Sequence, residues 1–169
     1  MKLLRNATLE SLHQTRSMLD ALVKLPAGQN LYEEAGIGTH VRHIIDHFLV
    51  LRDGLAENCI DYNRRNRDSD MERNIFVACN AIEELCQWIE TTDQLEEDRP
   101  ISILSEVSCQ QTVNVTINSN LMRELHYVSY HCIHHLAYCA LLAKQNDVDL
   151  DSAIGLAPGT ASFMRAINA

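Results

Sequence analysis

Histidines gather in two short segments of this 169-residue chain. Seven of the eight histidines lie within residues 40–47 and 126–135. Imidazole is the commonest protein ligand of divalent transition metals, and it binds as the neutral base. That form is available near neutral pH because the ordinary pKa of histidine is about 6.5. The clustering therefore indicates a metal site.

Both segments have the apolar spacing of helices, and residues four apart on a helix share a face. His43 and His47 form one such pair, and His131 and His135 form another. Each pair lies off the centre of its apolar stripe, where a cleft between two neighbouring helices would be lined. Imidazoles crowded there repel one another when protonated, and neutrality or a metal relieves the repulsion. Solvated or hydrogen-bonded histidines are the alternative interpretation.

Periodicity alone does not select the ligand from the first segment. His40 lies closer to the apolar stripe than His43, and His47 is one turn further along the same ridge. His40 could instead hold the glycine-rich entrance of the helix. The other two histidines of the second segment point elsewhere and are expected at the surface. Asp46 and Glu124 are candidates to accept the second N–H of a ligating imidazole.

The periodicity predicts an all-α four-helix bundle that forms a single domain over residues 1–169. Between the third and fourth helices, two segments rich in β-branched residues predict a small β-hairpin. The tail around residues 156–164 predicts a turn and a short terminal helix packed on the bundle. The four stretches with helical spacing of apolar residues are about 7–24, from just after Gly38 to 57, 70–91 and 119–144.

The net charge of −9, with 14 basic against 23 acidic residues, argues against a nucleic-acid partner. One basic cluster, Arg64–Arg67, is surrounded by acids and is interpreted as a solvated loop. No apolar run approaches the roughly 18 residues that span a bilayer, and the N-terminus turns polar too soon for a secretory signal. No membrane association and a cytoplasmic location are therefore expected. The six cysteines lack a C-x-x-C pair, so reduced thiols, mostly in the core, are expected.

The histidine pattern resembles that of a known superfamily. The run Val41-Arg42-His43-Ile44-Ile45-Asp46 on the second helix, followed by His131-x-x-x-His135 on the fourth, resembles the DinB and YfiT superfamily of four-helix bundles. That superfamily has a three-histidine metal site, with one ligand from helix two and a pair from helix four. The resemblance implies that His43, His131 and His135 are the ligands, with His47 ranked second on helix two. The superfamily commonly continues with a polar residue and glutamine, whereas residues 136–139 here are Leu-Ala-Tyr-Cys.

Three nitrogen ligands leave coordination positions open, which is typical of catalytic sites because structural zinc is normally closed by four protein ligands. All-imidazole ligation suits zinc, nickel, iron or copper, and zinc or nickel is expected. The resemblance implies a metal-dependent hydrolase, or a transferase or isomerase that uses a low-molecular-weight thiol as cosubstrate, acting on a small molecule. The alternative is a non-catalytic stress-response bundle that binds a metal or small ligand, since no second catalytic acid or base is obvious.

A homodimer is also expected. Tyr127, Tyr130 and Tyr138 cannot all face the core together with the apolar stripe of their helix, so some aromatic surface remains for a partner or a pocket rim. The alternative is that the tail around Phe163 and Met164 covers these tyrosines.

Overall fold

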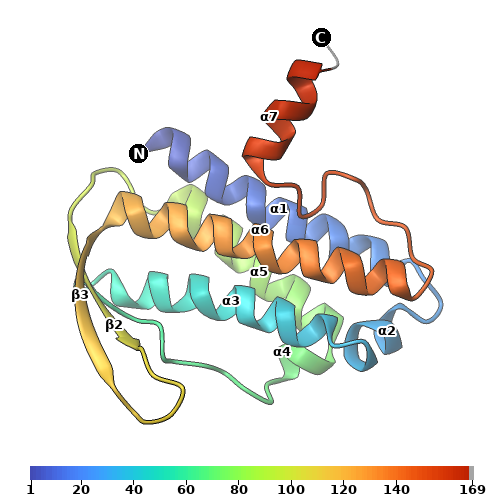
Figure 1. The fold of residues 1–169 in the computed structure, drawn as a ribbon, viewed down its shortest axis with the longest axis horizontal. Coiled ribbons are helices and arrows are strands. Elements are labelled where there is room, and N and C mark those ends of the chain that lie inside the picture. The colour runs from blue at the N-terminus through green and yellow to red at the C-terminus, as the bar shows by residue number, and fades with distance from the viewer. Residues whose placement is uncertain (168–169) are drawn as a thin grey trace.

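The computed structural model describes residues 1–167, and its four long helices form a bundle (Figure 1). The long helices are α1 (Lys2–Val23), α3 (Ile37–Gly54), α5 (Ile75–Thr91) and α6 (Leu121–Gln145). α1 packs on α5 and α6, and α3 packs on the same two helices. The predicted helical bundle with a small sheet is confirmed.

Each long helix turns one apolar stripe toward a shared core, as the spacing predicted. Asparagine side chains begin two of these helices: Asn74 accepts hydrogen bonds from the first-turn amides of α5, and Asn120 accepts one from the amide of Arg123 in α6. All six cysteines are free thiols, and four of them are buried, in agreement with the prediction. None of the helices among residues 1–167 is long and apolar enough to cross a membrane.

One short helix, α2 (Gly28–Glu34), was not predicted. The predicted third helix, residues 70–91, is divided at Asn74, whose backbone is extended, into α4 (Asp70–Arg73) and α5. The predicted end of the first helix near residue 24 is confirmed, but the chain begins α2 four residues later. Gly28 permits this close return, because a Cβ there would lie 1.8 Å from the carbonyl oxygen of Leu22.

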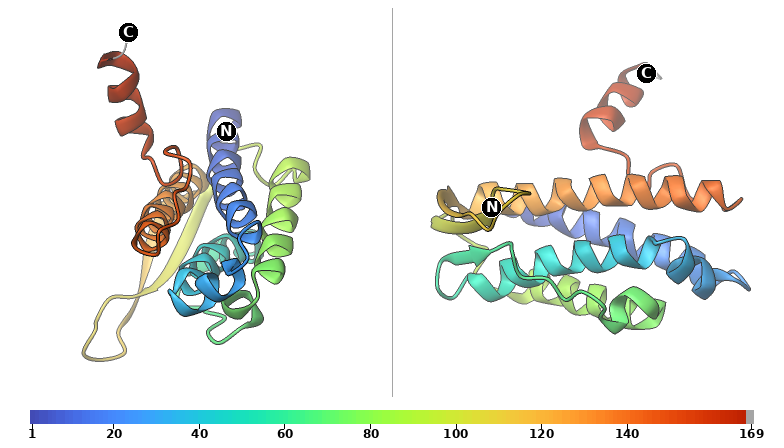
Figure 2. Two further views of the ribbon diagram at one scale, coloured as in Figure 1. Left: turned by 90° about the vertical axis from the view of Figure 1, so that its right-hand side faces the viewer. Right: turned by 60° about the horizontal axis from the view of Figure 1, so that its bottom comes forward.

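A three-stranded sheet lies at one end of the bundle (Figures 1 and 2). The predicted hairpin is confirmed: β2 (Pro100–Glu106) pairs antiparallel with β3 (Asn114–Asn120), which leads directly into α6. The third strand, β1 (Cys59–Asp61), pairs parallel with β2 and was not predicted, because three residues are too few to show an alternating pattern. The segment that follows β1 returns along α3 toward α4 (Figure 1).

The C-terminal helix α7 (Pro158–Ile167) exists as predicted but does not pack on the bundle. It projects away from α1 and α6 in both views of Figure 2, and none of its residues is buried. Phe163 is 65% exposed, so it does not cover the tyrosines of α6. The preceding loop is held instead, since Ile154 is buried and Gly155 lies against the backbone of Ala137. The tail therefore docks before α7 begins.

Candidate metal centre

The packing of α3 against α6 brings the two histidine segments together. One ring nitrogen from each of His43, His131 and His135 lies within 4.8 Å of the others. Nε2 of His43 and Nε2 of His131 lie 2.9 Å apart, within hydrogen-bond distance. These are the three residues that the resemblance implied as ligands, and each of their side chains is half-buried.

The core residues of both helices determine where these rings lie. His43 directly precedes Ile44, which is fully buried, and His131 and His135 directly precede Cys132 and Leu136, which are also buried. Because neighbouring residues on a helix are about 100° apart, a residue beside a core position lies at the edge of the apolar stripe. The three imidazoles therefore line the seam between the helices without entering the core.

His47 lies beside the cluster and is only 2% exposed. Its Nδ1 lies 3.0 Å from the carbonyl oxygen of His43 and donates to it, which leaves Nε2 as the unprotonated nitrogen. The His47 ring stacks on Tyr62, with ring centroids 5.3 Å apart, and its centroid is 4.2 Å from that of His131. His47 is not one of the three residues whose nitrogens converge. The His47 ring packs against the rings of His43 and His131 instead.

His40 contacts one of the three convergent residues. Its Nδ1 lies 2.9 Å from Nδ1 of His135, and its ring packs on Tyr138. When His135 donates this hydrogen bond, its Nε2 keeps the lone pair that a metal needs. The sequence suggested that His40 holds the glycine-rich entrance of its helix, whereas the structure shows it beside His135. His126 and His134 are exposed, as predicted.

The spacing of the nitrogens is close to what a metal ion requires. An ion bound tetrahedrally to two imidazoles at about 2.0–2.1 Å holds their nitrogens roughly 3.3 Å apart. The 2.9 Å between Nε2 of His43 and Nε2 of His131 is the length of an N–H···N hydrogen bond, and a small shift of the two rings would replace that hydrogen bond by an ion. The convergent group contains no carboxylate and no thiol. Such a donor set suits a borderline transition metal better than calcium or magnesium.

Burial makes all of these imidazoles weak bases. Desolvation, together with the charges of neighbouring histidines, lowers the pKa of His43 to about 2 and that of His135 to about 4. Desolvation and the charge of His134 lower the pKa of His131 to about 4, and desolvation and His131 lower the pKa of His47 to about 3. The rings are therefore neutral at pH 7, the protonation state in which imidazole binds metals.

Asp46 does not orient an imidazole, and that expectation is wrong. It is fully buried and accepts a hydrogen bond of 3.0 Å from Arg42. Its two oxygens also accept hydrogen bonds from the backbone N–H and the side-chain amide of Asn66, at 3.1 and 2.7 Å. Asp46 therefore fastens the segment after β1 to the side of α3.

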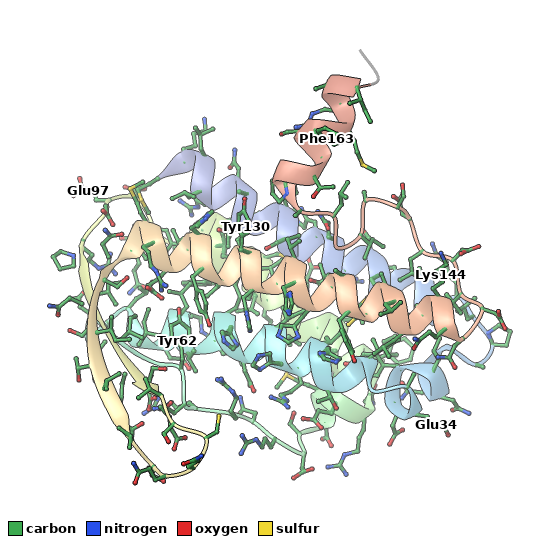
Figure 3. The ribbon with its side chains drawn as sticks, viewed as in Figure 1. Glu34, Tyr62, Glu97, Tyr130, Lys144 and Phe163 are labelled. Atoms are coloured by element: carbon green, nitrogen blue, oxygen red, sulfur yellow. The ribbon has the colours of Figure 1, made fainter. Side chains whose placement is uncertain are left out.

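Glu124 has a similar bracing role and likewise contacts none of the imidazoles. It is fully buried and accepts hydrogen bonds from the hydroxyl of Tyr62, at 2.8 Å, and from Ser119 and Arg123. Tyr62, which lies near the sheet end of α3 in Figure 3, stacks in turn on His47. Glu124 thus positions Tyr62, and through it the ring of His47 beside the histidine cluster.

Two residues beside the cluster, Tyr62 and Arg65, were missed by the sequence reasoning, and Tyr127 was considered only for a partner surface or a pocket rim. The ring of Tyr127 stacks on His131 at 5.5 Å between centroids. Arg65 was assigned to a solvated loop, but it is half-buried and its charge contributes to the lowered pKa of His131. Tyr127 is four residues before His131, and this spacing could have indicated the contact. The other two residues depend on the path of the chain after β1, which has no local signal.

Comparisons with known proteins give one partial likeness. A stretch of 106 residues is 26% identical to FK506-binding protein 5 of Rhizopus delemar, covering 63% of this chain and 28% of that protein. The chain thus spans less than a third of the length of that relative. No family profile matches the chain. No solved structure matches it either.

Proposed function

We propose that this chain is a metal-dependent enzyme of the DinB type, either a hydrolase or a thiol-dependent transferase or isomerase that acts on a small molecule. His43, His131 and His135 would hold one divalent transition metal, zinc or nickel. The observation that carries the proposal is the convergence of three neutral imidazole nitrogens within 4.8 Å, from helices far apart in the sequence.

When bound, the metal would supply a Lewis acid with coordination positions left for substrate. The chain's own residues then set the conditions around it. His40 fixes the orientation of His135 through the Nδ1 contact, and the ring of His47 covers the face of the cluster nearest Tyr62. Tyr127 borders the same region, and burial raises the pKa of its hydroxyl. It stays a neutral phenol that can donate a hydrogen bond to a bound substrate.

Metal binding is the first test. Element analysis of protein prepared without an affinity tag should find close to one transition-metal ion per chain. In calorimetric titrations with zinc and with nickel, His43→Ala, His131→Ala and His135→Ala should each abolish binding. His126→Ala is a matched control, because His126 is exposed on the same helix as two of the ligands. Wild-type protein that neither carries nor takes up metal would contradict the proposal.

Activity separates an enzyme from a non-catalytic metal-binding bundle. Zinc- and nickel-loaded protein should be assayed for hydrolysis of a nitrophenyl ester panel and for conjugation of glutathione to an electrophilic arene. We expect turnover in one of these reactions that is lost in His43→Ala. Stoichiometric metal binding with rates no higher than those of His43→Ala would favour the non-catalytic alternative.

A further inference from the structure

A pocket of about 400 Å³ adjoins the histidine cluster on the side of the sheet. Its walls come from three parts of the chain: α3 and α6, the segment after β1, and the turn between β2 and β3. His47 and Tyr127 belong both to this pocket and to the surroundings of the cluster, since the His47 ring packs on His43 and Tyr127 stacks on His131. The pocket therefore lies next to the proposed metal site, separated from its three histidines by His47 and Tyr127.

Two arginines line the pocket, and neither forms an ion pair among residues 1–167. Arg65 is half-buried, and its one side-chain hydrogen bond goes to the carbonyl oxygen of Arg64. Desolvation lowers the pKa of Arg65, but a guanidinium remains charged at neutral pH. A partly desolvated cation without an anionic partner is costly, and an anionic ligand relieves that cost.

The carboxylates around the pocket do not pair with the two arginines. The charge of Asp46 acts on Arg65, but its oxygens are already engaged by Arg42 and Asn66. Glu106 is the one acid that lines the pocket, and it forms no ion pair among the described residues. Two arginines and one glutamate leave a net positive charge in a chain whose total is −9, and a divalent metal would add to it.

The segment that carries the two arginines is held in place at two points. Asn66, between them, is hydrogen-bonded to Asp46 through its backbone and its side chain. Asn63 accepts a hydrogen bond of 2.7 Å from the backbone N–H of Glu106, and its own amide donates to Asn114 at 3.1 Å. These contacts position the arginines at the pocket before any ligand arrives, which lowers the entropic cost of binding one.

We propose that this pocket binds a small organic anion, whose carboxylate or phosphate is held by Arg65 and Arg67 and whose body packs on Tyr62 and Tyr127. The proposal rests on the function above in one respect: the anion is taken to be the substrate that is presented to His43, His131 and His135. A guanidinium binds both carboxylate and phosphate through paired hydrogen bonds, so the shared chemistry is the anionic head.

The test uses benzoate and phenyl phosphate as anionic probes and benzamide as a neutral analogue of benzoate. Each is titrated calorimetrically into the whole protein, both zinc-loaded and metal-free. We expect at least one of the anions to bind the zinc-loaded protein about tenfold or more tightly than benzamide. Phenyl phosphate binding without benzoate binding would indicate phosphate esters, and the reverse would indicate carboxylates. Equal affinity for benzoate, phenyl phosphate and benzamide would overturn the proposal.

Variants of neighbouring arginines identify the residues responsible. Arg65→Gln should weaken binding of the anion about tenfold and leave zinc affinity nearly unchanged. Arg64→Gln is the matched control, since its side chain is 73% exposed, lies 3.9 Å from Asp61 and does not line the pocket. It should change anion affinity less than about twofold. Circular dichroism verifies that both variants fold.

The two proposals fail separately. If Arg65→Gln binds the anion as tightly as the wild type does while zinc still binds, the anion pocket is refuted and the metal site stands. If the chain takes up no zinc but metal-free protein binds benzoate or phenyl phosphate in an Arg65-dependent way, the metal-dependent function is refuted and the anion pocket stands.

Discussion

At the scale of single residues, the tautomer of His135 decides whether its nitrogen is available to a metal. His40 is the group beside its other nitrogen, at 2.9 Å. We predict that His40→Ala lowers zinc affinity about 10- to 100-fold, the usual effect of losing a hydrogen-bond partner of a ligating histidine. Competition titration against a chelator of known affinity measures the change.

His40→Gln provides the comparison, because its amide can still form a hydrogen bond at this position. It should recover part of the lost affinity. If His40→Ala abolished zinc binding as completely as His43→Ala, His40 would itself be a ligand. If it had no effect, the contact with His135 would play no part in binding.

The lowered pKa values of the histidines also predict how stability depends on pH. Folded His131 and His135 have pKa values of about 4, whereas an unfolded histidine has the ordinary value of 6.5. The unfolded chain therefore binds more protons between these values, so the free energy of unfolding falls as the pH drops below 6.5 toward 4. Above pH 6.5 these histidines make no further contribution to the pH dependence.

Thermal unfolding of metal-free protein from about pH 7 to about pH 4 measures this dependence. We expect Tm to fall across the interval, and the double variant H131A/H135A to show a smaller histidine-dependent part of that fall. A metal-free wild type and double variant with the same pH dependence would contradict the assigned burial of the two rings.

At the scale of elements, helical periodicity predicted the long helices, and β-branched alternation predicted the hairpin. Neither pattern could predict β1, because a three-residue strand shows no period. Helical spacing also did not reveal the break at Asn74 that separates α4 from α5. The prediction that α7 packs on the bundle was wrong for another reason. An amphipathic pattern indicates a helix, but it does not show which surface, if any, the helix contacts. The segment after β1 was placed by the hydrogen bonds of Asn66 to buried Asp46, which no local pattern reveals.

The contact between the segment after β1 and Asp46 can be tested by substitution of Asn66. Asn66→Ala removes the side-chain hydrogen bond to Asp46 and leaves one oxygen of a buried carboxylate without this partner. We expect it to lower the free energy of unfolding by about 1–3 kcal/mol, as measured by urea denaturation. Asn146→Ala is a suitable control, since that amide donates to a backbone carbonyl on the exposed end of α6. Equal effects of the two substitutions would show that the Asp46 contact does not anchor the segment.

At the scale of the whole molecule, α7 is separate from the bundle core. Figure 3 shows Phe163 on the projecting helix, and Met164 is 47% exposed. The base of α7 borders a groove of about 760 Å³ between α1 and α6, which contains none of the three convergent histidines. We predict that deletion from residue 158 onward leaves the helical circular dichroism per residue of the bundle and its zinc affinity unchanged. Loss of either would show that α7 supports the core.

The homodimer stays a prediction at this scale. Tyr130 and Tyr138 are 45% and 49% exposed on α6, whereas Tyr127 borders the histidine cluster. Light scattering of the full chain beside the deletion variant measures the mass of each.

The three convergent histidines could be anticipated from the sequence because two of them follow a local spacing rule. His131 and His135 are one turn apart, and the resemblance selected His43 from three histidines on the facing helix. The structure brings these three together and gives His40 and His47 different contacts. Periodicity alone could not separate those roles, since all three helix-two histidines lie near the same seam.

X-ray absorption of the zinc-loaded protein tests most directly whether three imidazoles hold the metal. We predict scattering from three imidazole rings at about 2.0–2.1 Å, with the remaining ligands being oxygen and with no sulfur. A sulfur shell at about 2.3 Å would indicate binding through a cysteine instead. That result, or fewer than three imidazoles, would contradict the site formed by His43, His131 and His135.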